Sequence, residues 1–277
     1  MLTAVTSSIV RLTVWAVPVA MCVILAGCGG GSAVDRVNES VSGLPAPSGA
    51  STEARPTVSA ADLNATISGR VSFEGDVPRL GVINMATEQV CDAANKQNPQ
   101  RGEEWVVGEG GGLANVLVQV KTNLPAFDHA APTEPVVFDQ AGCVYRPHVF
   151  GLRTGQTLRI LNPDRITHNV NVQPKVNRAF NAGMPGVQTQ LDRTFDDVET
   201  TPFSVRCNVH PWMTAWTAVL DHPYFAVTGP DGSFTIPDLP AGTYELEMWH
   251  EVAGVQTQTI TVGSNATAEA SFAVSVR

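Results

Sequence analysis

The sequence has few charged residues, which make up 16% of its 277 positions. Lys and Arg number 17 against 26 Asp and Glu, so the formal net charge is −9. This deficit of basic residues argues against a nucleic-acid partner, because phosphate binding requires positive charge. Hydrophobic residues reach 43%, a balance that argues against a mostly disordered chain and favours a β-rich globular structure.

Long hydrophobic runs are also scarce. The uncharged run from Leu12 to Gly27 has about 16 residues, short of the roughly 20 that a membrane-spanning helix needs. It follows Arg11 and ends directly before Cys28. These features predict that residues 1–27 are a secretory signal peptide. A leader cleaved elsewhere and an uncleaved anchor are the alternatives.

The four residues Leu25-Ala26-Gly27-Cys28 resemble the bacterial lipobox. In lipoproteins of this kind, cleavage before the cysteine leaves it as a lipidated N-terminus. The resemblance implies lipidation of Cys28 and an extracytoplasmic location, anchored to a bacterial membrane on its periplasmic or cell-surface face. Removing the leader deletes one arginine and no acid, which takes the net charge from −9 to −10. Residues 28–64 have the composition of a flexible tether.

Helical periodicity longer than two turns is missing after the tether. From Thr66 onward, apolar residues alternate with polar ones, beginning with Ile67, Val71 and Phe73, and turn signals separate the segments. The pattern predicts an all-β fold, with residues 65–222 as one β-sandwich domain.

The C-terminal residues 223–277 differ from the preceding segment in their sequence pattern. Turns at 230–232 and 240–242 predict two hairpins. These strands resemble the small transthyretin-like or carboxypeptidase-regulatory-like β-sandwich, which implies a second β module. The boundary near His222 is soft, and one interleaved sandwich is the alternative.

Cysteine is rare, with five in the chain. Cys22 leaves with the leader and Cys28 carries the lipid, so three thiols remain in an oxidising compartment. Because Cys207 has metal-binding residues around it, we expect a Cys91–Cys143 disulfide and a reduced Cys207. Pairing Cys207 with Cys91 or with Cys143 is the alternative, and either pair would remove the thiolate.

Cys207, His210 and Met213 are spaced three residues apart. A thiolate, an imidazole and a thioether suit copper, which also requires a second histidine. His168 is the candidate, because it shares the inward face of an alternating strand with the valines at 170 and 172, while Cys207 follows another inward-facing series. A disulfide half, a surface histidine and a core methionine that happen to lie close together in sequence form the alternative interpretation.

These residues resemble those of the cupredoxins, the type 1 blue copper proteins of the plastocyanin/amicyanin-like kind. The short loop is especially similar to that of amicyanin, because plastocyanin has a longer spacing. The resemblance implies a Greek-key β-sandwich with one mononuclear copper ion. Its equatorial ligands would be His168, Cys207 and His210, and Met213 would be the weak axial ligand. Asn169 would link the two ligand loops by hydrogen bonds.

The resemblance implies a non-enzymatic electron carrier that uses Cu(I)/Cu(II) cycling and an unknown redox partner protein. In related proteins the histidine of the cysteine loop reaches the surface, so we expect an exposed edge at His210, flanked by Pro211 and Trp212. A catalytic Cys–His pair would need a third orienting group, and the sequence identifies none. Copper sequestration or delivery is one alternative function. A non-redox surface lipoprotein that binds carbohydrate or protein is another.

Overall fold

The computed structural model describes residues 58–125 and 129–276. In this part of the chain strands dominate, which confirms the all-β prediction. The α-helix α1 (Gln89–Asn95) is short, and 3₁₀ turns occupy Ala60–Asp62, Glu109–Gly111 and Ala141–Cys143. Among the described residues, no helix has the length and apolar character to span a membrane. The predicted leader, Cys28 and most of the tether lie outside the described residues.

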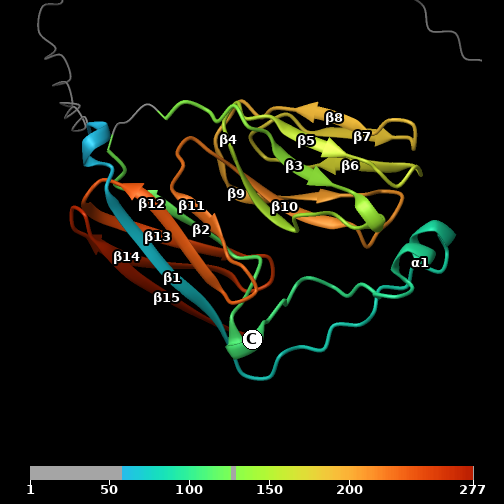
Figure 1. The fold of residues 1–277 in the computed structure, drawn as a ribbon, viewed down its shortest axis with the longest axis horizontal. Helices are drawn as coiled ribbons and strands as arrows, with labels where there is room; N and C mark the ends of the chain where they lie inside the picture. Colours follow the sequence, from blue (N-terminus) through green and yellow to red (C-terminus); the bar gives the residue numbers. More distant parts are fainter. Residues whose placement is uncertain (1–57, 126–128, 277) are drawn as a thin grey trace, which may run out of the picture. The chain divides into compact units, whose positions relative to one another are not determined.

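Two sheets form a first β-sandwich (Figure 1). One has the order β12-β1-β15 and the other β11-β2-β13-β14. Their bounds are β1 (Ala65–Glu74), β2 (Leu117–Thr122), β11 (Phe225–Val227), β12 (Ser233–Leu239), β13 (Gly242–His250), β14 (Gly254–Val262) and β15 (Thr267–Ser275).

Alternation of apolar residues builds the core of this sandwich. Ile67, Val71 and Phe73 of β1 point inward with the apolar faces of β12 and β15, opposite those of β2 and β13. Gly69 is required where β1 meets β15, because a Cβ there would lie 1.9 Å from the backbone oxygen of Ala270.

This first sandwich draws strands from both predicted segments. Figure 1 shows β1, in blue, between the orange and red strands β12 and β15. β1 runs antiparallel to β12 and parallel to β15, and β2 pairs with β11 and β13. Thus β1 and β2, which come from the range 65–222, pair with strands from the range 223–277 in these two sheets.

The second β-sandwich consists of a five-stranded sheet, β4-β10-β9-β6-β7, and a three-stranded sheet, β3-β5-β8. Its core contains the inward residues of both sheets, including Phe138, Ile160 and Val205. The bounds are β3 (Val136–Asp139), β4 (Val149–Arg153), β5 (Leu158–Leu161), β6 (His168–Val172), β7 (Phe180–Met184), β8 (Gln190–Arg193), β9 (Glu199–Arg206) and β10 (Thr214–Leu220).

Candidate metal centre

Two neighbouring strands bring the predicted ligands together. β6 begins at His168, and β9 ends at Arg206, directly before Cys207. The strands are antiparallel, with Asn171 opposite Arg206, so the start of β6 lies beside the loop that follows β9. That loop carries residues 207–213 and leads into β10.

Three of the predicted ligands form one cluster. Ligand atoms of His168, Cys207 and His210 all lie within 4.8 Å of one another. The two Nδ1 atoms of the histidines are 2.9 Å apart, and the Sγ of Cys207 lies 3.8 Å from Nδ1 of His210. Their exposed fractions are 0%, 3% and 2%, respectively. The cluster is therefore almost sealed from water.

Met213 closes the loop. Its backbone N–H donates to the carbonyl of His210 at 2.9 Å, and its own carbonyl accepts the N–H of Cys207 at 3.1 Å. Its side chain is buried in the same apolar core as Cys207. The loop thus folds back on itself with its methionine on the inside.

The surroundings of the sulfur favour its ionised form. Burial by itself raises the pKa of Cys207, but hydrogen bonds from the His168 side chain and from the backbone N–H groups of Asn169 and His210 outweigh burial and lower it. Burial lowers the pKa of His168, but hydrogen bonds with Asp164 and Cys207 raise it to about 9. Burial and the nearby charge of His168 both lower the pKa of His210.

Asn169 connects the two ligand segments. Its side-chain oxygen accepts the backbone N–H of Asn208, next to Cys207, and its amide donates to Asn181 on β7. Its backbone carbonyl accepts the hydroxyl of the buried Tyr145.

The three cysteines in the described residues divide into a pair and a single thiol. Cys91 and Cys143 form a disulfide with a Cα–Cα distance of 5.5 Å, while Cys207 is free and buried. A second group with ligand atoms within 4.8 Å contains Cys143, Asp164 and His168. Because the sulfur of Cys143 is in the disulfide, this group lacks a free thiolate.

The edge at His210 differs from the expected exposed patch. His210 is only 2% exposed, and the ring of Trp212 lies 5.2 Å from its ring. The indole N–H of Trp212 donates to the carbonyl of Cys143 at 2.9 Å. His210 is thus buried beside Trp212, which is bonded to the turn at Cys143, although the sequence alone predicted this histidine to be accessible.

Sequence reasoning missed Asp164 and Tyr145. Asp164 accepts a hydrogen bond from Nε2 of His168 at 2.9 Å, four residues away. In the sequence Asp164 belongs to the turn Asn162-Pro163-Asp164. Its position four residues before His168 was the one signal that could have suggested a contact with that histidine.

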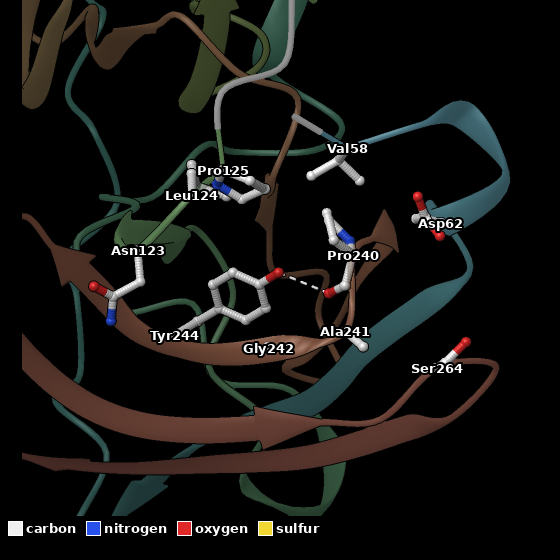
Figure 2. A pocket seen from close by; sticks show the side chains of 10 residues that line it. All are labelled: Val58, Asp62, Asn123, Leu124, Pro125, Pro240, Ala241, Gly242, Tyr244 and Ser264. Atoms are coloured by element: carbon white, nitrogen blue, oxygen red, sulfur yellow. Dashed lines mark hydrogen bonds between the residues drawn. The ribbon is translucent and has the colours of Figure 1, made fainter. Parts of the chain in front are cut away.

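The first β-sandwich contains a pocket of about 680 Å³ (Figure 2). The hydroxyl of Tyr244 donates to the carbonyl of Pro240 there, at 2.7 Å. No histidine, cysteine or methionine lines the pocket, so it offers no donor set for a soft metal ion. Its lining residues are Val58, Asp62, Asn123, Leu124, Pro125, Pro240, Ala241, Gly242, Tyr244 and Ser264.

Comparison with known sequences gives one partial match. The family described as "Polysaccharide lyase family 4, domain II" matches residues 204–270, less than half of the chain. This match begins inside β9 and ends inside β15. No curated protein matches the chain.

Some solved structures of copper proteins are weakly similar. A mutant amicyanin with Cu(I) is 19% identical with a TM-score of 0.28, over 37% of this chain and 98% of that one. A Cu-containing nitrite reductase from Thermus scotoductus SA-01 is 18% identical with a TM-score of 0.30, over 38% and 25%. A purple cupredoxin from Nitrosopumilus maritimus is 18% identical with a TM-score of 0.25, over 31% and 99%. Because these TM-scores are low, the similarity shows no function for this chain.

Proposed function

We propose that this chain is an extracytoplasmic type 1 copper protein that carries single electrons and is tethered to a bacterial membrane through lipidated Cys28. The main support is the buried cluster in which His168, at the start of β6, meets Cys207 and His210 of the loop that ends in Met213. Two imidazoles, a thiolate and a thioether are the donor set of electron-transfer copper sites.

The distances in the cluster fit a single bound ion. Metal–nitrogen bonds of about 2.0–2.1 Å and metal–thiolate bonds of about 2.3 Å are typical of zinc, the neighbour of copper in the first transition row. Atoms separated by 2.9 Å and 3.8 Å can therefore bind the same ion with such bonds. Copper binding would require the thiolate of Cys207 and a metal-facing nitrogen of His168 without its proton, so the ion would displace protons on binding.

The protein's own groups hold the site and exclude water. His168 and Cys207 are fixed by adjacent strands, and the backbone hydrogen bonds of Met213 hold the loop closed. Bound copper would supply a one-electron couple. Because packed strands hold the ligands in place, they need to move little between the two oxidation states.

The burial of the ligands favours an electron carrier over copper delivery. Delivery requires exchange with another chain, whereas exposures of 0–3% leave almost no open approach to the ligands. The role proposed here is electron transfer and not catalysis. The partners of the proposed carrier are the membrane and a redox protein, and the shortage of basic residues argues against nucleic acid.

The test is copper loading of the full chain in detergent. We expect an intense blue thiolate-to-copper absorption and a reversible redox couple. Cys207→Ser should abolish the colour, whereas Asp192→Asn, which alters an exposed ion pair with Arg159, should leave it unchanged.

The alternatives give different results. Lack of colour in the wild type, or colour retained in Cys207→Ser, would refute the proposal and favour a non-redox surface sandwich. Rapid loss of copper to a modest chelator would favour delivery. Mass mapping that finds Cys207 in a disulfide of the metal-loaded protein would also refute it.

A further inference from the structure

Asp164 holds one ring nitrogen of a proposed ligand. Its Oδ2 lies 2.9 Å from Nε2 of His168, while Nδ1 of the same ring faces His210 at 2.9 Å. A histidine that donates through Nε2 to a carboxylate keeps the lone pair of Nδ1 free for a metal. The ring orientation and tautomer that ligation requires are therefore the ones that Asp164 favours.

Asp164 is itself fixed by a turn formed by Gly142 and Cys143. The backbone N–H of Gly142 donates to Oδ1 at 2.7 Å, and that of Cys143 donates to Oδ2 at 2.8 Å. Both turn residues have positive φ, 69° and 59°, and successive residues in special turn conformations can direct their N–H groups at one anion. The carboxylate of Asp164 thus accepts three hydrogen bonds, and together they fix its orientation.

The turn is fastened from the other side by α1. Cys91 of α1 forms the disulfide with Cys143, and Asn95 of the same helix donates to the carbonyl of Gly142 at 2.8 Å. Both cysteines are fully buried. The left-handed conformation of Cys143, which is unusual for a residue with a side chain, is held in place by these contacts.

The same turn also reaches the second ligand loop. The carbonyl of Cys143 accepts the indole N–H of Trp212 at 2.9 Å, two residues after His210. One turn is therefore connected to His168 through Asp164 and to the loop of Cys207 and His210 through Trp212.

We propose that Asp164, presented by the disulfide-fastened turn at Gly142–Cys143, is the positioning residue that orients His168 and so controls copper retention and reduction potential. This inference rests on the proposed copper-binding function. The disulfide acts through Asp164: it keeps the two backbone donors directed at the carboxylate.

The primary test compares Asp164→Asn with the wild type in the full chain. An asparagine amide offers one oxygen and presents N–H donors, so it cannot accept from all three partners. We expect copper affinity to fall by about 10–100-fold, as is typical when the partner of a ligating histidine is removed. We also expect a higher reduction potential, because loss of the carboxylate weakens binding of Cu(II) more than of Cu(I). Each tenfold difference between the two affinities corresponds to about 59 mV.

Two further variants separate positioning from simple folding effects. Asp164→Glu retains a carboxylate and should recover part of the potential and affinity. Asp192→Asn removes an equivalent charge from an exposed pair and should match the wild type in both. If Asp164→Asn lowers the thermal stability of the metal-free protein but leaves affinity, potential and blue absorption unchanged, Asp164 is merely structural and the inference is refuted.

A double-mutant cycle tests the role of the disulfide. Cys91→Ser/Cys143→Ser should shift the potential in the same direction as Asp164→Asn, and it should add little in the Asp164→Asn background. Full additivity would show that the disulfide acts independently of Asp164 and would overturn that step. A wild type without blue colour would instead refute the proposed function, so the two failures are distinguishable.

Discussion

Glu199, at the start of β9, is a buried carboxylate whose removal has a calculable cost. It is 6% exposed and accepts the backbone N–H groups of Lys175, Val176 and Asn177 at 2.6, 3.1 and 3.1 Å. The side-chain amide of Asn177 adds a contact at 3.3 Å. This one side chain therefore fixes the segment that follows β6.

Glu199→Gln should destabilise the fold by about 2–3 kcal/mol. A hydrogen bond to a charged group contributes roughly 1.5–3 kcal/mol against roughly 0.5–1.5 for a neutral one, and the glutamine amide leaves at least one buried N–H without an acceptor. For a domain of this size, the melting temperature should fall by roughly 5–10 °C.

The pH dependence gives a second readout. Burial raises the pKa of Glu199, but the backbone N–H groups of the 175–177 segment outweigh it and lower the pKa. A lowered folded-state pKa gives stability that is present above the unfolded value of about 4.3 and is lost as the pH falls through the folded value. The difference between wild type and Glu199→Gln should thus be constant near pH 7 and shrink below about pH 4.

Urea unfolding of the metal-free protein across this pH range measures the effect. Glu269→Gln is the control, because Glu269 bonds an exposed Ser68 hydroxyl, and its loss should change stability by less than about 0.5 kcal/mol. A Glu199→Gln penalty below that of the control, or one independent of pH, would refute the reasoning.

Two other substitutions test the packing and the electrostatics. Gly69→Val should lower the free energy of unfolding in urea by about 3 kcal/mol or more, because its Cβ would overlap a backbone oxygen of β15. Gly183→Val is the control and should be nearly neutral, because a Cβ there would meet nothing within 4 Å. Equal effects of the two substitutions would contradict this explanation. Burial lowers the pKa of His148, but the carboxylates of Glu251 and Glu103 outweigh it and raise the pKa above the ordinary value of about 6.5. Glu251→Gln should therefore lower the NMR titration midpoint of His148, and stability that the pair contributes below pH 6.5 should be lost as the pH of the wild type rises through the raised pKa. An unchanged midpoint would argue against the pair.

Local patterns made much of the architecture predictable. Alternation at Ile67, Val71 and Phe73 and at the valines of β6 reflects the two-residue period of a strand with one buried face. Cys207, His210 and Met213 lie on one loop, so their proximity follows from sequence spacing. The phase of His168 on its strand predicted an inward side chain, and its ring is fully buried.

Long-range contacts could not be read in the same way. Apolar alternation does not identify a strand's partner, so the pairing of β1 with β12 and β15 left no local signal. The role of Asp164 depends on two consecutive left-handed residues in a distant turn. The placement of Trp212 beside His210 depends on a hydrogen bond from its indole N–H to the carbonyl of Cys143, 69 positions away.

The parallel pairing of β1 with β15 has a consequence for folding. Ser68 and Glu269, whose side chains bond at 2.7 Å, are 201 positions apart in sequence. During synthesis, the sheet of β1 cannot be completed until β15 has been made, and such non-local contacts slow folding. In the meantime its edge is open to incorrect pairing with other chains. The second β-sandwich, which contains the cluster of His168, Cys207 and His210, has all its strands between residues 136 and 220 and can form before β15 is made.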